Sequence, residues 1–289
     1  MMKQQWFNQL SLPHITRIQP VSGGDVNQAY HLVTEAGDYF LLTQPRVTKE
    51  FYAGEIAGLK AFQEAGITAP RVIANGEIDH IAYLILSYLE EGTGQNQYAL
   101  GQLVAKLHQA TSPTGQFGFD YSYQGTAIQF PNQWRDSWIQ LFVNERMDTL
   151  SQVLLKQGLW QDVDNERYQE VRAIIVDVLN HHPSQPSLLH GDLWFGNVMF
   201  LTDGQPALFD PSPLYGDREF DLGVTRTFGG FSGDFYCGYE DTLPTAKGSR
   251  YRQEFYRLYL LMIHLLKFGP TYAMSVDHAM EQILARPHE

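Results

Sequence analysis

The stretch of residues 187–222, SLLHGDLWFGNVMFLTDGQPALFDPSPLYGDREFDL, constrains this chain more than any other. Asp192 lies in a His-Gly-Asp sequence, and Asn197 follows it five residues later. Asp210 ends a short apolar run. Two strand-like segments within residues 197–209, joined by an Asp-Gly turn, predict a β-hairpin. Such a hairpin would carry Asn197 and Asp210 back to the same end, beside Asp192.

Two carboxylates and an amide arranged in this way suit phosphoryl transfer. Nucleotide phosphates require a divalent cation to offset their charge, and hard cations prefer oxygen ligands such as those of Asn197 and Asp210. Asp192 can then accept the proton of an attacking hydroxyl, as the catalytic-loop aspartate of protein kinases does. The alternative is a loop in which these residues only cap turns. The joint spacing, with a hairpin between, favours the catalytic interpretation.

The first ninety residues predict a small sheet with one helix. A turn at Asn75-Gly76 is expected to join the last two strands. The periodicity places the strands at residues 15–21, 28–33, 39–43, 70–74 and 81–86, and the helix at residues 49–65.

Two features of this N-terminal part are candidates for nucleotide binding. The turn Ser22-Gly23-Gly24 separates the first two predicted strands, and its glycines would let the backbone approach phosphate oxygens. A plain hairpin turn explains these glycines equally well. Glu55 lies within the apolar face of the predicted helix, where a carboxylate requires a partner or water. The alternative is a side chain at the edge of that face that reaches solvent.

From residue 97 onward the pattern is mainly helical. Residues 110–130 show no clear period and predict a long loop, a kind of segment that is often functional or mobile. Further helices are expected within residues 149–181, 249–267 and 272–285. The sequence therefore predicts an α+β chain with an N-terminal domain at residues 1–92 and a C-terminal domain at residues 93–289.

Composition excludes several classes of partner. The chain has 20 basic and 32 acidic residues and a formal net charge of −12. This charge argues against nucleic acid or an anionic membrane as the main partner, but not against ATP. Cys237 is the single cysteine, so no intrachain disulfide can form. The N-terminus lacks the apolar core of a signal peptide, and no apolar stretch is long enough to cross a bilayer. We expect a cytoplasmic protein, and the sequence does not define its oligomeric state.

The segment at residues 190–197, HGDLWFGN, resembles the signature of the fructosamine/ketosamine kinase family. Residues 210–222 resemble the DP…YGDREFDL run of that family. Aminoglycoside phosphotransferases and choline kinases share the HGD…N…D core, but they do not usually have Trp194 or this run. The resemblance is strong over residues 187–230 and weaker in the first 90 residues. It implies a protein-kinase-like bilobal fold, with a mostly antiparallel five-stranded sheet plus one helix in the N-terminal lobe and a mainly helical C-terminal lobe that carries the catalytic hairpin.

The resemblance also implies residue roles and the cofactors ATP and Mg²⁺. Asp192 would be the catalytic base or would orient the substrate hydroxyl, and Asn197 and Asp210 would bind magnesium. Nucleotide-binding roles are implied for Ser22, Gly23 and Gly24 over the phosphates, for Glu55 on the helix, and for Ser87, Tyr88 and Leu89 as the hinge beside adenine.

Two further residues would contact a small-molecule sugar-amine substrate. The resemblance implies this role for Trp194, through its aromatic face, and for Asp217, through its carboxylate. The alternatives are a packing role for Trp194 and a structural ion pair between Asp217 and Arg218.

One position departs from the family pattern. The third strand of the family carries a lysine that contacts the α- and β-phosphates, and the matching residue here is Leu42. A leucine offers no charge to a phosphate. Arg46, Lys49 or Lys60 could supply a cation from another direction, nucleotide binding could be weak, or the chain could be a pseudokinase.

The leading hypothesis from the sequence is an ATP-dependent small-molecule kinase that phosphorylates a hydroxyl of a fructosamine or ketosamine. One alternative, motivated by Leu42, is a non-catalytic pseudokinase that binds a nucleotide or metabolite. A further alternative is an aminoglycoside- or choline-type kinase. Retention of Asp192, Asn197 and Asp210 favours the kinase.

Overall fold

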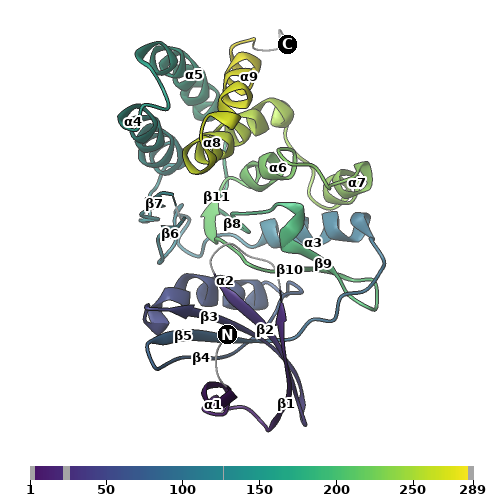
Figure 1. The fold of residues 1–289 in the computed structure, drawn as a ribbon. Coiled ribbons are helices and arrows are strands. Elements are labelled where there is room, and N and C mark those ends of the chain that lie inside the picture. The colour runs from purple at the N-terminus through teal and green to yellow at the C-terminus, as the bar shows by residue number, and fades with distance from the viewer. Residues whose placement is uncertain (1–3, 22–26, 126, 286–289) are drawn as a thin grey trace. The chain divides into compact units, whose positions relative to one another are not determined.

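The computed structural model describes residues 4–21, 27–125 and 127–285. The chain divides into two compact units (Figure 1). One comprises Met1–Gln95 and Met199–Phe209, and the other comprises Asn96–Val198 and Asp210–Glu289. The first contains an antiparallel five-stranded sheet and the second is mainly helical, which confirms the predicted α+β class.

The sheet of the N-terminal unit is antiparallel throughout. The central strand β3 pairs with β2 and β5, so that Phe40 lies between His31 and Leu86. The strand order is β1 (Ile15–Val21), β2 (Gln28–Thr34), β3 (Gly37–Pro45), β5 (Ile81–Ser87) and β4 (Val72–Ile78).

Helices α1 (Gln4–Phe7) and α2 (Ala53–Glu64) lie on opposite sides of this sheet (Figure 1). Trp6 and Phe7 of α1 form a buried cluster with alternating sheet residues that include Leu41. Because neighbouring side chains on a strand point to opposite faces, Leu42 faces away from this cluster. A 3₁₀ turn, η1 (Lys49–Tyr52), leads into α2, so the predicted helix is present in two parts.

The turn between β4 and β5 is not where the sequence predicted it. Asn75 and Gly76 lie inside β4 and pair with Leu84 and Tyr83. The chain instead reverses at Asp79 and His80, which have φ angles of 51° and 60°. Aspartate and histidine tolerate this left-handed conformation better than most residues. The cross-strand register therefore determined the turn more strongly than the Asn-Gly signal did.

The C-terminal unit is built mainly from helices. Within the predicted loop at residues 110–130 the chain forms a short hairpin of β6 (Tyr123–Gln124) and β7 (Gln129–Phe130). A second strand pair joins β8 (Ser187–Leu189) to β11 (Leu214–Gly216). The helices are α3 (Gln97–Gln109), η2 (Gln140–Met147), α4 (Asp148–Lys156), α5 (Asp162–Asn180), η3 (Phe195–Asn197), α6 (Glu219–Thr225), α7 (Gly233–Thr242), α8 (Ser249–Phe268), η4 (Pro270–Tyr272) and α9 (Ala273–Leu284).

Helices α3 and α7 approach each other closely through two glycines. A Cβ atom at Gly101 would lie 2.0 Å from the carbonyl oxygen of Phe235, and one at Gly238 would lie 2.1 Å from that of Tyr98. Any larger side chain would separate these helices. Within the described part of the chain, no helix combines the length and the apolar character that crossing a bilayer requires.

A buried ion pair connects α6 to α8. The Arg252 guanidinium donates from Nε and Nη2 to the two carboxylate oxygens of Glu219, at 2.8 and 2.7 Å. Both residues are buried. A bidentate pair of this kind offsets the cost of removing both charges from water only while both partners are present.

Replacing Glu219 by Gln should strongly destabilise the C-terminal unit, because it leaves a buried guanidinium without its counter-charge. We expect the free energy of unfolding to fall by about 3–5 kcal/mol. The measurement is urea unfolding followed by tryptophan fluorescence. The matched control is Glu281→Gln, because the side chains of the Arg167–Glu281 pair are 32% and 59% exposed and the loss of this pair should cost less than about 1 kcal/mol. Equal, small effects of the two substitutions would contradict this interpretation.

Candidate active site

The predicted hairpin is present. Strands β9 (Val198–Phe200) and β10 (Pro206–Leu208) pair, and the backbone N–H of Leu201 donates to the carbonyl of Gln205 at 2.8 Å to close the turn. Asn197 directly precedes β9, and Asp210 follows β10 by two residues. Asp192 lies on the loop between β8 and the 3₁₀ turn η3.

The buried carboxylate of Asp221, on α6, holds the backbone of the loop that leads to Asp192. Its Oδ2 accepts a hydrogen bond from the backbone N–H of His190 at 2.7 Å, and its Oδ1 accepts one from Gly191 at 2.9 Å. Asp221 is 0% exposed. Hydrogen bonds to an ionised acceptor are stronger than those between neutral groups, so these two contacts restrict the position of the loop.

A chain of side chains in turn orients Asp221. Nε2 of His108 lies 3.1 Å from the Oδ2 atom of Asp221, and Nδ1 of His108 lies 2.8 Å from the Tyr239 hydroxyl. Arg218 donates to the same hydroxyl at 3.1 Å. A neutral His108 with its proton on Nε2 satisfies all three contacts. The network ties helices α3 and α7 to the loop that carries Asp192.

Gly191 cannot be exchanged for a larger residue in this loop. Its φ angle is 79°, and a Cβ atom there would lie 1.8 Å from the carbonyl oxygen of Ser212. The two segments are further joined by the backbone N–H of Ser212, which donates to the carbonyl of His190 at 2.8 Å. This close approach brings the segment after Asp210 against the loop before Asp192.

Asp192, Asn197 and Asp210 lie in one neighbourhood. The amide Nδ2 of Asn197 donates to the backbone carbonyl of Asp192 at 2.9 Å and to its Oδ2 at 3.2 Å. Asp210 has a φ angle of 55°, in the left-handed region that few non-glycine residues adopt. The carboxylate of Asp210 is close enough to raise the pKa of Asp192.

Both carboxyl groups have a raised pKa. For Asp192 burial is the largest cause, and Asp210 adds to it, while His190 and the hydrogen bond from Asn197 lower the pKa. Asp210 keeps solvent-exposed surface, yet the protein atoms around it still raise its pKa by desolvation, against the opposing effect of His190. Negative charge at this site is therefore only partly compensated by the protein.

The donor set fits a divalent cation such as Mg²⁺. Asn197 directs its NH₂ group towards Asp192, which leaves its carbonyl oxygen for another partner. Among the described residues, none donates a hydrogen bond to the Asp210 carboxylate. An amide oxygen and a carboxylate are the hard oxygen ligands that magnesium prefers.

The two predicted substrate residues occupy different environments. The Trp194 side chain is 45% exposed, and its indole covers Gly196. Asp217 is buried, and it accepts hydrogen bonds from Ser184 Oγ at 2.6 Å and from the backbone N–H of Glu219 at 2.9 Å. A substrate contact for either residue stays a prediction.

The surroundings of Asp217 are those of a structural carboxylate. His182 Nε2 lies 3.2 Å from its Oδ2 atom. Burial alone would raise the pKa of Asp217, but hydrogen bonds from His182 and Ser184 outweigh it and hold the pKa below its usual value. Arg218 binds Tyr239 and the carbonyls of Leu243 and Pro244.

The predicted nucleotide-binding residues lie in the N-terminal unit. Ser22, Gly23 and Gly24 lie outside the described residues. Glu55 is half-buried in the first turn of α2. Their roles stay predictions, as do those of the three predicted hinge residues.

The predicted hinge follows β5. Ser87 Oγ accepts a hydrogen bond from the backbone N–H of Arg71 at 2.8 Å, which connects the end of β5 to the segment before β4. The Tyr88 ring stacks on His31, with ring centroids 3.9 Å apart and planes 8° apart. Leu89 is half-buried. Leu42, where the family pattern has lysine, is half-buried on β3.

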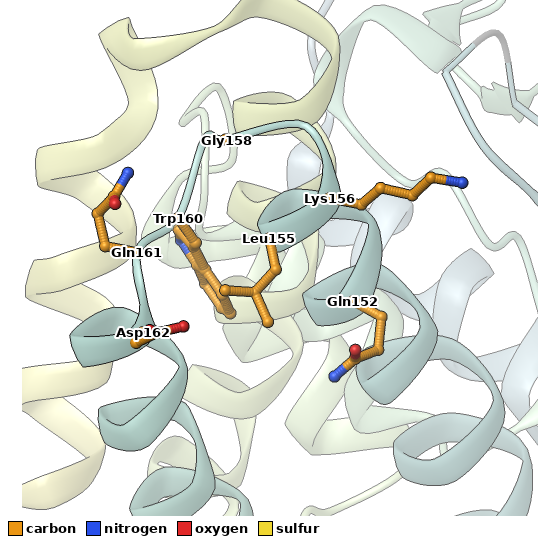
Figure 2. A pocket seen from close by; sticks show the side chains of 7 residues that line it. All are labelled: Gln152, Leu155, Lys156, Gly158, Trp160, Gln161 and Asp162. Carbon is orange, nitrogen blue, oxygen red and sulfur yellow. The ribbon is translucent and has the colours of Figure 1, made fainter.

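A pocket of about 490 Å³ opens at the turn between α4 and α5, away from these residues in the sequence (Figure 2). Figure 2 shows Leu155 and Trp160 at its centre, with Lys156 pointing outward. Its lining includes no residue of the predicted site. Trp160 also packs on Tyr168, with the ring centroids 5.7 Å apart.

Sequence reasoning missed Asp221 and His108 as site residues. One signal was available for Asp221: it lies in the short segment EFDLGVT, whose other residues are mostly apolar. A carboxylate in such a helix requires internal donors. The identity of those donors depends on tertiary contacts between segments about 110 and 30 residues away, which no local pattern encodes.

Three comparisons place the chain among known proteins. Residues 1–286 match the fructosamine kinase family. A protein of Staphylococcus aureus named "Probable ketoamine kinase" is 56% identical over 283 residues, which cover 98% of each chain. A protein of Lactiplantibacillus plantarum with the same name is 41% identical and covers 96% of this chain and 98% of its own.

Solved structures share the fold. The structure of a protein from Haemophilus somnus named as a fructosamine-3-kinase has a TM-score of 0.82 and 25% identity, covering 97% of this chain and 94% of that one. An aminoglycoside phosphotransferase, solved as a ternary complex with AMP-PNP and hygromycin B, has a TM-score of 0.63 and 15% identity, covering 94% and 93%. The second likeness shows the fold alone, and it confirms the predicted kinase-like architecture.

Replacing Asp221 by Asn should loosen the loop before Asp192. The substitution exchanges one acceptor oxygen for an NH₂ group that faces the amides of His190 and Gly191, so at least one hydrogen bond is lost. We expect the amide that loses its bond to exchange with deuterium at least about tenfold faster. Hydrogen exchange read out by mass spectrometry or NMR provides the measurement.

The matched control is Asp203→Asn. Asp203 accepts a hydrogen bond from the backbone N–H of Gln205 in the exposed hairpin turn, so its substitution should leave exchange at residues 190–191 unchanged. Native protection of both amides in the Asp221 variant would show that this carboxylate does not hold the loop.

Proposed function

This chain belongs to the fructosamine kinase family, and we propose that it transfers the γ-phosphoryl group of ATP, with magnesium, to a hydroxyl of a ketosamine. The family and the relatives named as ketoamine kinases support a phosphotransferase. The observation that carries the finer proposal is the arrangement of Asp192, Asn197 and Asp210. They combine a partly buried carboxylate with two oxygen donors suited to a metal ion.

Asp192 is the proposed general base. In the transfer, the substrate hydroxyl oxygen forms a bond to the γ-phosphorus, the bond to the bridging oxygen breaks, and ADP leaves. The hydroxyl proton passes to the Asp192 carboxylate. Its raised pKa brings the carboxyl closer to the operating pH, where a general base is most effective. The hydrogen bond from Asn197 fixes the orientation of the carboxylate.

Asn197 and Asp210 are the proposed magnesium ligands. A bound cation there would neutralise charge on the phosphates and compensate the Asp210 carboxylate. The left-handed backbone of Asp210 is consistent with this role, because strained conformations of non-glycine residues concentrate at functional sites. Exposed Trp194, beside this loop in sequence, offers an aromatic face to the sugar.

Leu42 provides no positive charge for the nucleotide phosphates, whereas Arg46, Lys49 and Lys60 are exposed side chains of the same unit. The non-catalytic alternative, which Leu42 motivated, has no support from the relatives, because they are named as kinases. The comparisons add only a likeness of fold to the aminoglycoside alternative. A ketosamine is therefore the substrate class that we propose.

Replacing Asp192 by Asn should abolish most of the turnover, because an amide cannot accept the hydroxyl proton. We expect kcat to fall by about a hundred- to ten-thousandfold with a modest change in the KM for ATP. The measurement is ADP release with magnesium, ATP and a panel of fructosamines and ribulosamines.

Asp203→Asn, an exposed substitution in the hairpin turn, serves as the control and should keep the kcat of the unmodified protein. Turnover that survives Asp192→Asn unchanged would remove Asp192 from its proposed role. An absence of turnover with every member of the panel would reject the ketosamine as the acceptor.

A further inference from the structure

The hairpin of β9 and β10 is bonded to the segment that follows the predicted hinge. The backbone N–H of Gly92 donates to the carbonyl of Phe200 at 2.7 Å, and that of Thr202 donates to the carbonyl of Glu90 at 3.2 Å. The residues between these two pairs form an antiparallel bridge. Residues 90–92 therefore pair with the end of β9 as a third strand-like segment, within the N-terminal unit to which both segments belong.

The returning strand of the hairpin is anchored to the same unit. The backbone N–H of Leu208, at the end of β10, donates to the carbonyl of Thr68 at 2.9 Å. Ala207 and Leu208 are both buried. A buried backbone hydrogen bond is costly to break, because its groups lose their partner without gaining water. The main chain of the N-terminal unit thus holds both strands of the hairpin.

Each of these anchors is close in the chain to a proposed magnesium ligand. Asn197 lies three residues before the anchor at Phe200, and Asp210 lies two residues after the anchor at Leu208. Within two residues of each ligand, the chain passes from one unit to the other. The anchors therefore restrict where the two ends of the hairpin can lie, and with them the two ligands.

Gly92 is the point at which this connection leaves no room for a side chain. A Cβ atom there would lie 2.4 Å from the carbonyl oxygen of Leu201 and 2.9 Å from the Cα atom of Thr202. Both are backbone atoms, which cannot turn aside as the end of a flexible side chain can. The φ angle of Gly92 is not in the left-handed region, so close packing and not backbone conformation requires glycine. Any side chain would push the hairpin away from residues 90–92.

We propose that Gly92 is a positioning residue: its close approach to the hairpin keeps Asn197 and Asp210 where they can bind one magnesium ion together. The inference rests on the proposed function. Magnesium requires nearly ideal octahedral geometry with short bonds to oxygen, so a small displacement of either ligand weakens its binding. The predicted hinge at residues 87–89 directly precedes the segment that binds the hairpin, so one continuous stretch of chain connects the nucleotide-binding residues to the metal ligands.

The test replaces Gly92 by Ala, with Gly94→Ala as the matched control. A Cβ atom at Gly94 would meet no atom within 4 Å, and the φ angle of Gly94 is likewise outside the left-handed region. Both substitutions remove the same conformational freedom from the unfolded chain, but only the first creates a clash. Calorimetry measures the metal contribution to binding, defined as the ratio of the affinity for Mn²⁺–ADP to the affinity for metal-free ADP.

We expect Gly92→Ala to lower this metal contribution by about tenfold, the effect of losing one well-placed contact. In turnover assays, the magnesium concentration that gives the half-maximal rate should rise by a similar factor, while the KM for the ketosamine stays within about twofold. Gly94→Ala should leave all three quantities unchanged. A purely structural role of Gly92 would lower the thermal stability of the protein without changing the metal contribution.

A second variant, Thr202→Pro, keeps the test decisive if the Gly92 variant does not fold. Residues 201–204 form a type I turn, because the backbone N–H of Gly204 donates to the carbonyl of Leu201 at 2.8 Å and neither Thr202 nor Asp203 has a positive φ angle. Proline is favoured at the first central position of such a turn. The substitution therefore keeps the turn and removes one of the two connecting hydrogen bonds. We expect the metal contribution to fall by about threefold.

Thermal unfolding shows whether each variant folds. A metal contribution that stays unchanged in the folded Gly92 and Thr202 variants, or that falls equally in Gly94→Ala, would overturn the proposal. An unmodified protein whose affinity for ADP does not depend on Mn²⁺ would overturn it as well. Failure of the proposed function gives a different result, because no ketosamine is then turned over while the metal contribution to ADP binding still decides the inference.

Discussion

The two hydrogen bonds that Asp221 accepts from the backbone of His190 and Gly191 are the constraint on which the candidate site depends. They connect helix α6 to the loop that carries Asp192, and His108 extends the connection to α3. A backbone segment held at consecutive amides has little freedom to rotate. The position of Asp192 is therefore set by the core of the C-terminal unit and not by contacts of its own side chain alone.

The carboxylates of the C-terminal unit fall into two groups. Asp217 and Glu219 are compensated by protein groups, Ser184 and His182 for the first and Arg252 for the second. Among the described residues, no lysine or arginine pairs with the carboxylates of Asp192 or Asp210, and the pKa of both is raised. The carboxylates of Asp217 and Glu219 are neutralised internally, whereas those of the candidate site have no cationic side chain paired with them among the described residues. Uncompensated charge, more than cavity volume, distinguishes this site from the pocket at the α4–α5 turn.

The sequence predicted the hairpin and the α+β class because their signals are local. Strand alternation and the Asp-Gly turn are signals that extend over only a few residues. They predict the hairpin that brings Asn197 and Asp210 to the same end, beside Asp192. The environment of Asp221 could not be predicted in this way. Whether a buried charge meets a partner depends on segments far away in the chain.

The turn between β4 and β5 shows that long-range contacts can also override a strong local signal. Asn75-Gly76 carries a strong local signal, yet pairing with β5 keeps both residues within the strand. Long-range register outweighed local preference. The hairpin of β6 and β7 was missed for a related reason, since two-residue strands give too short a pattern to detect.

The most direct test of the proposed kinase activity is to measure where the γ-phosphoryl group of ATP goes. ³¹P NMR of the unmodified protein with ATP, magnesium and a ketosamine should show the γ-phosphate resonance decay while a sugar phosphomonoester resonance grows in equal amount with ADP. Formation of inorganic phosphate in place of the phosphomonoester, or no loss of ATP with any ketosamine, would contradict the assignment of this site as a ketosamine kinase centre.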